Sequence, residues 1–176
     1  LQASTPSPLY TKAAIQLALK SPAGQRTAWI VVEAEDDLNV YQKFMNPAST
    51  VVKTSENADG RRGYANVESI VTEIKSEMPS AHICGIRDAD YTRYETAVHV
   101  FPENIFPSDR RDLEMTLLDA ESVRNEMQSW ATGFESALAL CIPICRHLGY
   151  LRIYNMVKNL SCMFRDRLLP AKFWNF

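Results

Sequence analysis

At 176 residues, the chain is long enough for one ordinary domain and a short appendage. Its hydrophobic content of 46% and charged content of 23% are typical of a soluble globular protein and exclude a disordered chain. The net charge of −2 excludes a strongly basic protein, and no run of about 18 uncharged apolar residues occurs, so we expect no transmembrane helix.

Residues 1–26 are predicted to form an N-terminal arm or docking helix. Ser, Thr and Pro are frequent here and surround one short apolar periodic piece, residues 13–19. Leu1 is not followed by the basic-then-apolar order of a secretory signal, so we interpret the start as a trimmed terminus.

A buried strand is predicted over residues 28–32, where β-branched and aromatic residues form an apolar run. Four acids follow within five residues: Glu33, Glu35, Asp36 and Asp37. Asp36 or Asp37 is expected to cap the next helix, which Pro47 ends. The side chains expected to face the sheet from this helix are Leu38, Tyr41, Phe44 and Met45.

The next stretch repeats the pattern of strand, loop and helix. Residues 50–54 form a second predicted strand, and residues 56–64 form a loop that contains two adjacent arginines between glycines. Asn66 is expected to cap an amphipathic helix that Pro79 closes. The apolar positions of this helix are Val67, Ile70, Val71, Ile74 and Met78.

Residues 81–86 form a third predicted strand and residues 98–101 a fourth. Strands that alternate with helices through short connections predict an α/β fold, with a mostly parallel, Rossmann-like sheet flanked by helices. We assign this domain to residues 27–119, followed by a C-terminal helical extension over residues 120–176. We expect the protein to continue beyond Phe176, because aromatic residues stand at this edge.

Helices are predicted in the last third of the chain, over residues 112–118, 122–130 and 135–148, with a less regular segment to residue 168. Asp112 is a candidate cap, and Pro143 is expected to kink or break its helix. Cys141 and Cys145 lie four apart among apolar residues and are expected to be buried thiols in a cytoplasmic protein. Six of the 19 basic residues but one of the 21 acidic residues follow residue 135, so this end would face phosphates, an acidic partner or solvent.

Acidic residues end both the first and the third predicted strand, where Asp88 and Asp90 follow. The carboxyl ends of parallel strands meet at one edge of a sheet. Clustered carboxylates repel one another there unless a cation lies among them, and divalent cations prefer such oxygen ligands. The candidate ligands of one cation are Glu33, Asp37, Asp88, Asp90 and Glu114, the last beside the apolar stripe of its helix.

The order of these motifs resembles the Toprim signature. The sequence Val31-Val-Glu-Ala-Glu-Asp-Asp37 is similar to its first motif, in which a Glu ends the first strand, and Asp88-Ala-Asp90 is similar to its DxD pair. The added Asp112-Leu-Glu114 and the loop over residues 60–67 are similar to the OLD-related branch of Toprim nucleases. That branch includes the kind that serves as effector of the PARIS phage-defence system. The resemblance spans about residues 29–118.

The resemblance implies a Toprim-like catalytic domain and a role for each matching residue. The catalytic residues would be Glu33, Asp88 and Asp90. The metal ligands would be Glu33, Asp37, Asp88, Asp90 and Glu114. The family usually has Gly after the first Glu, where this chain has Ala34. A position that needs positive φ would be altered by this methyl group.

Carboxylate ligands suit Mg²⁺ or Mn²⁺. Such an ion at a scissile phosphate would stabilise the developing charge and orient the attacking water. We therefore expect a metal-dependent endonuclease that hydrolyses phosphodiester bonds of RNA, tRNA included, or of DNA. Guanidinium groups near the acids would bind the substrate phosphates. The candidates are Arg61, Arg62, Arg110 and Arg111.

Two other functions are consistent with the same residues. In the first, the chain is a latent or non-catalytic Toprim subunit that is regulated by a partner ATPase. The resemblance implies this partner, and the chain has no ATP-binding P-loop of its own. Alternatively, Asp88-Ala-Asp90-Tyr-Thr92 fits the nucleophile motif of haloacid-dehalogenase-type phosphatases, although it follows two βα units here. A homodimer is compatible with each of these functions, and no membrane partner is expected.

Overall fold

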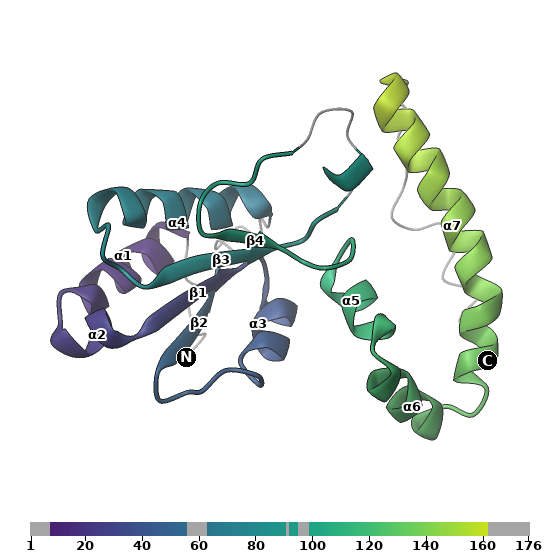
Figure 1. The fold of residues 1–176 in the computed structure, drawn as a ribbon, viewed down its shortest axis with the longest axis horizontal. Helices are drawn as coiled ribbons and strands as arrows, with labels where there is room; N and C mark the ends of the chain where they lie inside the picture. Colours follow the sequence, from purple (N-terminus) through teal and green to yellow (C-terminus); the bar gives the residue numbers. More distant parts are fainter. Residues whose placement is uncertain (1–7, 56–62, 91, 95–98, 162–176) are drawn as a thin grey trace, which may run out of the picture. The chain divides into compact units, whose positions relative to one another are not determined.

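The structure, a computed structural model, describes residues 8–55, 63–90, 92–94 and 99–161 (Figure 1). The chain divides into two compact units. The first comprises Leu1–Arg93 and His99–Ala120, and the second comprises Tyr94–Val98 and Glu121–Phe176. All the described acidic residues of the predicted site belong to the first unit.

The first unit contains a parallel sheet of four strands in the order β2-β1-β3-β4 (Figure 1). These strands are β1 (Ala28–Val32), β2 (Thr50–Thr54), β3 (Ile83–Arg87) and β4 (Ile105–Pro107). Trp29 pairs with Val51 of β2 and Ile83 of β3, and Gly85 pairs with Ile105. The predicted α/β class, with a parallel sheet flanked by helices and a C-terminal helical extension, is therefore confirmed.

The strand order reverses direction between β1 and β3. From β1 the chain passes through α3 (Glu35–Tyr41) to β2 on one side, and then through α4 (Tyr64–Glu77) to β3 on the other. Right-handed crossovers place these two helices on opposite faces of the sheet (Figure 1). Ligands of open α/β sheets bind at such a reversal, beyond the carboxyl ends of the strands.

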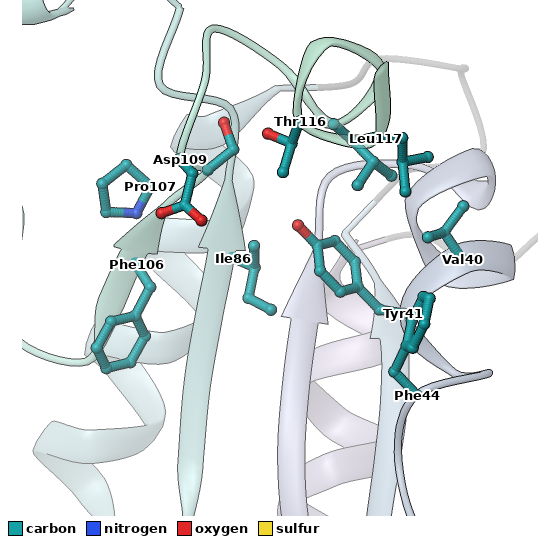
Figure 2. A pocket seen from close by; sticks show the side chains of 11 residues that line it. Val40, Tyr41, Phe44, Ile86, Phe106, Pro107, Asp109, Thr116 and Leu117 are labelled. Carbon is teal, nitrogen blue, oxygen red and sulfur yellow. The ribbon is translucent and has the colours of Figure 1, made fainter. Parts of the chain in front are cut away.

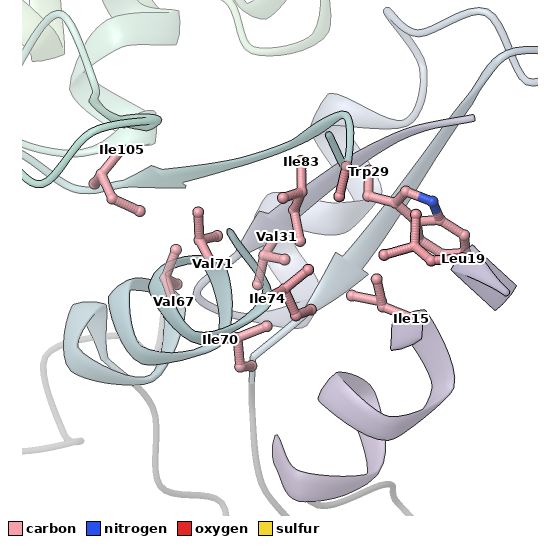
Figure 3. Packing of buried hydrophobic residues seen from close by; sticks show 11 residues of the cluster. Ile15, Leu19, Trp29, Val31, Val67, Ile70, Val71, Ile74, Ile83 and Ile105 are labelled. Carbon is pink, nitrogen blue, oxygen red and sulfur yellow. The ribbon is translucent and has the colours of Figure 1, made fainter. Parts of the chain in front are cut away.

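The core lies between the sheet and two helices, α4 and α1 (Pro8–Leu19) (Figure 3). Ile15 and Leu19 of α1 pack with the predicted apolar positions of α4 against Trp29 and Val31. Lys12 also forms ion pairs with two acids of α4, at 2.5 and 3.0 Å. Helix α1, which the sequence suggested as part of an arm or as a docking helix, packs into the core of the first unit. A short helix, α2 (Pro22–Arg26), connects it to β1.

Several predicted boundaries differ from those observed. Helix α3 ends at Tyr41, because Lys43 and Phe44 donate backbone hydrogen bonds three residues back, and Phe44 is exposed instead of facing the sheet. Helix α4 begins at Tyr64 after Gly63, so Asn66 is not its cap. The Asn66 amide donates instead to the carbonyl of Ser55, at 3.3 Å.

The fourth strand was predicted over residues 98–101 and lies instead at Ile105–Pro107. Residue 98 is outside the described part, and residues 99–101 form no strand. Val100 is 82% exposed there, whereas Ile105 is buried in the core beside Gly85. Burial of Ile105 against α4 thus determines which segment pairs with β3. The periodicity of the sequence gives no information about this contact.

The helical region contains α5 (Leu113–Asp119) in the first unit, and α6 (Glu121–Trp130) and α7 (Phe134–Lys158) in the second. Helix α7 continues through Pro143, so the predicted break is wrong. Cys141 and Cys145 are exposed on it, in contrast to the predicted burial.

No helix among the described residues combines the length and apolarity needed to cross a membrane.

Candidate active site at the carboxyl ends of the strands

Glu33 joins the ends of three strands. It follows β1 directly, and its carboxylate oxygen Oε1 accepts a 2.9 Å hydrogen bond from the backbone N–H of Asp88, the residue after β3. Its carbonyl accepts a 3.2 Å hydrogen bond from the hydroxyl of Ser55, the residue after β2. The Glu33 side chain is therefore held, half-buried, at the point where the strand order reverses.

Asp37 lies in the first turn of α3, where its carboxylate accepts a 3.0 Å hydrogen bond from the backbone N–H of Ala34. Ala34 itself has an extended backbone with φ −141°. This residue therefore needs no glycine-like conformation, and its methyl group causes no backbone strain. Asp37 caps the start of the helix while its carboxylate stays half-buried at the sheet edge.

Asp88 and Asp90 leave β3 in a tight turn. Asp88 is half-buried, whereas Asp90 is exposed and adopts a left-handed backbone with φ 48°. The Asp90 N–H donates to the carbonyl of Arg111 at 2.7 Å, which ties the turn to the segment before α5. Ser108 supports the same turn, because its hydroxyl accepts a 3.0 Å hydrogen bond from the N–H of Ala89.

The two acids near α5 have different environments. Asp112 is buried and caps α5, since its carboxylate accepts a 2.9 Å hydrogen bond from the N–H of Met115. It also accepts a 2.6 Å hydrogen bond from Arg111 Nε. Glu114, the candidate ligand, is exposed in the first turn of the helix. The structure therefore gives Asp112 the capping role that the sequence left open.

Burial and mutual repulsion raise the pKa of three of these carboxyl groups. Burial is the largest cause at Glu33 and Asp37, where hydrogen bonds from backbone N–H groups act in the opposite direction. Burial, followed by the charge of Glu33 and then of Asp37, raises the pKa of Asp88 to about 7. Asp90 also repels Glu33, and Glu114 repels Asp37. The five predicted ligands thus act on one another electrostatically at one edge of the sheet.

The acidic edge fits a hard divalent cation by the chemistry of its oxygen donors. Within the described ranges, however, no three His, Cys, Asp or Glu side chains converge as a metal-binding group. Mg²⁺ is usually held by one or two carboxylates together with substrate phosphates and water. Glu33, whose carboxylate accepts from the backbone N–H of Asp88, and the carboxylate of Asp88, whose pKa the charge of Glu33 raises, are the pair that could supply these ligands.

Arg87 supports this pair through contacts with α4 and with the Asp88 backbone. Its side chain is buried, forms a 2.7 Å ion pair with Glu68 of α4, and lies 3.8 Å from the ring centroid of Tyr64. Its Nε donates to the carbonyl of Asp88 at 3.1 Å. Arg87 therefore anchors the Asp88 backbone.

Two of the four arginines predicted to bind substrate lie in the described part of the chain, and each forms an ion pair with an acid. Arg110 pairs with Asp119, and both side chains are more than half exposed. Arg111 pairs with Asp112. Arg61 and Arg62 lie outside the described residues.

A cavity of about 340 Å³ lies beside the acids, between α3 and α5, at the carboxyl ends of β3 and β4 (Figure 2). Tyr41 lies in the wall of this cavity. Its pKa is raised to about 12, chiefly by burial, and the charges of Asp37, Asp88 and Asp109 add to this effect. The sequence suggested Tyr41 only as a sheet-facing residue. Tyr41 follows Asp37 by four residues on a predicted helix, which places both side chains on one side of it. This spacing could have identified Tyr41 as a neighbour of the site.

No protein-family model, curated protein or solved structure matches the chain. The functional interpretation therefore rests on the residues and contacts of the chain itself.

Proposed function

We propose that the chain is a metal-dependent nuclease of the Toprim type that hydrolyses phosphodiester bonds of RNA or DNA. The observation that carries this proposal is the hydrogen bond between Glu33 and Asp88 at the reversal of the strand order. It fixes the Glu33 carboxylate against the backbone of Asp88, where α/β sheets bind their ligands, and the charge of Glu33 contributes to the raised pKa of the Asp88 carboxyl. The raised pKa values of Glu33, Asp37 and Asp88 support a cation there, because a bound cation would offset their repulsion.

Each acidic residue has a role in this proposal. Mg²⁺ or Mn²⁺, when bound, supplies a Lewis acid for the scissile phosphate. Glu33 and Asp88 would hold the ion, with Asp90, Asp37 and Glu114 as the outer negative groups. Glu33 is also the candidate general acid or base, since its carboxylate is half-buried and fixed by a backbone N–H.

Arg110 is the described arginine best suited to hold a substrate phosphate. Its pair with Asp119 joins two exposed side chains, and such surface pairs contribute only about 0–1 kcal/mol. A substrate phosphate would compete with Asp119 for this exposed side chain. Arg111 is less available, because the carboxylate that it pairs with is buried and also caps α5.

Cleavage of mixed single-stranded and duplex RNA and DNA tests the proposal. The wild-type chain should cut at least one substrate with Mg²⁺ or Mn²⁺, and Glu33→Ala should lower the rate about 100-fold or more. Glu35→Ala is the matched control, because Glu35 is an exposed acid two residues away. Cleavage by Glu33→Ala at the wild-type rate would refute the catalytic assignment.

A second candidate function is a latent subunit held by a partner, an ATPase by resemblance to the PARIS system of antiviral defence. The exposed apolar residues of α7 favour it, because patches of this kind mark interaction surfaces. They include Leu140, Ile144, Tyr150, Leu151 and Tyr154. If this function is correct, the chain should purify in complex with an ATPase, and the complex should cut nucleic acid only after the chain is released.

A further inference from the structure

The cavity between α3 and α5 lies beside the acidic edge. On α3, Tyr41 follows Asp37 by four residues, so both side chains lie on the same side of the helix. Asp88 directly follows β3, two residues after Ile86 of the cavity wall, and its charge adds to the causes that raise the pKa of Tyr41. The cavity wall and the carboxylates of Asp37 and Asp88 are therefore neighbours at the end of the sheet.

The cavity has apolar walls and a few polar groups. Its lining is Val40, Tyr41, Phe44, Ile86, Phe106, Pro107, Ser108, Asp109, Leu113, Thr116 and Leu117. Figure 2 shows the Tyr41 ring between Val40 and Ile86, with its hydroxyl directed away from Phe44. The hydroxyls of Ser108 and Thr116 are engaged with backbone groups. Among the described residues, the Tyr41 hydroxyl and the Asp109 carboxylate make no hydrogen bond, so a ligand finds one donor and one acceptor there.

We propose that this cavity binds one unpaired nucleobase, that of the nucleotide next to the phosphate that a cation at Glu33 and Asp88 would contact. The inference rests on the proposed nuclease function and names the form of its substrate, a single strand or an unpaired loop of nucleic acid. A volume of about 340 Å³ is at the small end of ligand sites, enough for one flat ring system but not for a base pair.

The chemistry of the walls matches such a base. Aromatic and aliphatic side chains accept the faces of a base, as in proteins that bind single strands. The Tyr41 hydroxyl and the Asp109 carboxylate would contact donor and acceptor atoms on the edge of the base. In a duplex this edge is occupied by the pairing partner, so recognition of this kind selects unpaired nucleotides.

A cavity-filling variant tests the inference. Leu117→Trp enlarges a side chain of the cavity wall, and Leu17→Trp is the matched control, since Leu17 is 70% exposed on α1. Circular dichroism and thermal unfolding show whether each variant folds. The substrates are single strands of RNA and of DNA, the same strands in duplexes, and single strands with one abasic position at the cleavage site, all with Mn²⁺.

The wild-type chain and Leu17→Trp should cut the intact single strand about 10-fold or more faster than the duplex or the abasic strand. Leu117→Trp should lower kcat/KM for the intact strand to the level of the abasic one. Asp109→Asn, an exposed and isosteric change, should alter the relative rates of strands with different bases at that position. Equal cleavage of intact and abasic strands by the wild-type chain would overturn the inference. Faster cleavage of RNA or of DNA identifies the source of the base.

Binding of mononucleotides separates the failure of this inference from the failure of the proposed function. AMP, CMP and ribose 5-phosphate are titrated into the wild-type chain by calorimetry. The nucleotides should bind about 5-fold or more tightly than the sugar phosphate, and Leu117→Trp should abolish the difference. Should this binding occur without any cleavage, the nuclease function is wrong and the base cavity stands. Should cleavage depend on Glu33 without this binding difference, the cavity inference is wrong and the nuclease function stands.

Discussion

The carboxylate of Glu33 accepts a 2.9 Å hydrogen bond from the backbone N–H of Asp88, so β1 and β3 are connected beyond their ends through an acidic side chain. The bond holds one carboxylate close to the start of another acidic segment. Burial and repulsion between the carboxylates at this edge lower the stability of the fold when the carboxylates are ionised.

Replacement of Asp88 by Asn should stabilise the metal-free protein at alkaline pH. Burial and neighbouring carboxylates raise the folded-state pKa of Asp88 to about 7, above its ordinary value of 3.8. The folded state thus binds this proton more tightly than the unfolded state, and stability falls as the pH rises from about 4 to about 7. Asp88→Asn should add about 1–2 kcal/mol to the free energy of unfolding at pH 8, with the partial exposure of the group discounted. Near pH 4 the two proteins should differ little.

Urea denaturation at pH 4, 6 and 8 measures this difference. Glu35→Gln serves as control, because its exposed side chain should change the free energy of unfolding by less than about 0.5 kcal/mol at each pH. A stabilisation by Asp88→Asn that is equal at pH 4 and pH 8 would contradict the assignment of a raised pKa.

Mg²⁺ or Mn²⁺ should raise the thermal stability of the wild-type chain. A ligand at ten times its dissociation constant adds about 1.4 kcal/mol, or about 3–5 °C in Tm for a chain of this size. EDTA should reverse the shift, and both Glu33→Gln and Asp88→Asn should remove most of it. Differential scanning calorimetry with and without the ion provides the measurement. An equal shift in wild-type protein and both variants would place the ion elsewhere.

Arg87→Leu should destabilise the first unit by about 3 kcal/mol. The change leaves Glu68 without its partner and removes the contact with the Tyr64 ring and the hydrogen bond to the Asp88 carbonyl. Arg87→Lys should have an intermediate effect, because it keeps the charge but loses the planar fork of donors. Urea denaturation of both variants measures these values. Arg110→Leu, at an exposed pair, should cost less than about 1 kcal/mol, and a similar cost at both arginines would contradict the anchoring role.

Gly85→Ala should destabilise the protein by about 1–3 kcal/mol. An added Cβ would lie 2.5 Å from Val67 Cγ1 and 2.8 Å from Ile105 Cδ1, where β3 meets α4 and β4. Combining Gly85→Ala with Val67→Ala should cost less than the sum of the two single changes, because the second change removes the closest atom. Gly149→Ala, on open helix surface, should be neutral or stabilising. Equilibrium unfolding of all four variants tests this, and strict additivity would count against the close packing.

The sequence by itself determined the three longer strands and their parallel arrangement. The apolar run before Glu33, the short strand that ends at Thr54 and the run before Asp88 each report burial through local composition. The alternation of these strands with helices then leaves few topologies. From this order it follows that acids after β1 and β3 share one edge, which the bond between Glu33 and Asp88 shows.

Only the tertiary structure decided what surrounds that edge. Helix α1 enters the core through Ile15 and Leu19, and Ile105 rather than an earlier residue forms the fourth strand, because each is buried against α4. Arg87 is an anchor because Glu68 and Tyr64 reach it from another helix. The cavity arises because α3 and α5, far apart along the chain, both line it. These features depend on contacts between segments that are distant in the sequence. Local periodicity and residue spacing do not indicate which of these segments pack together.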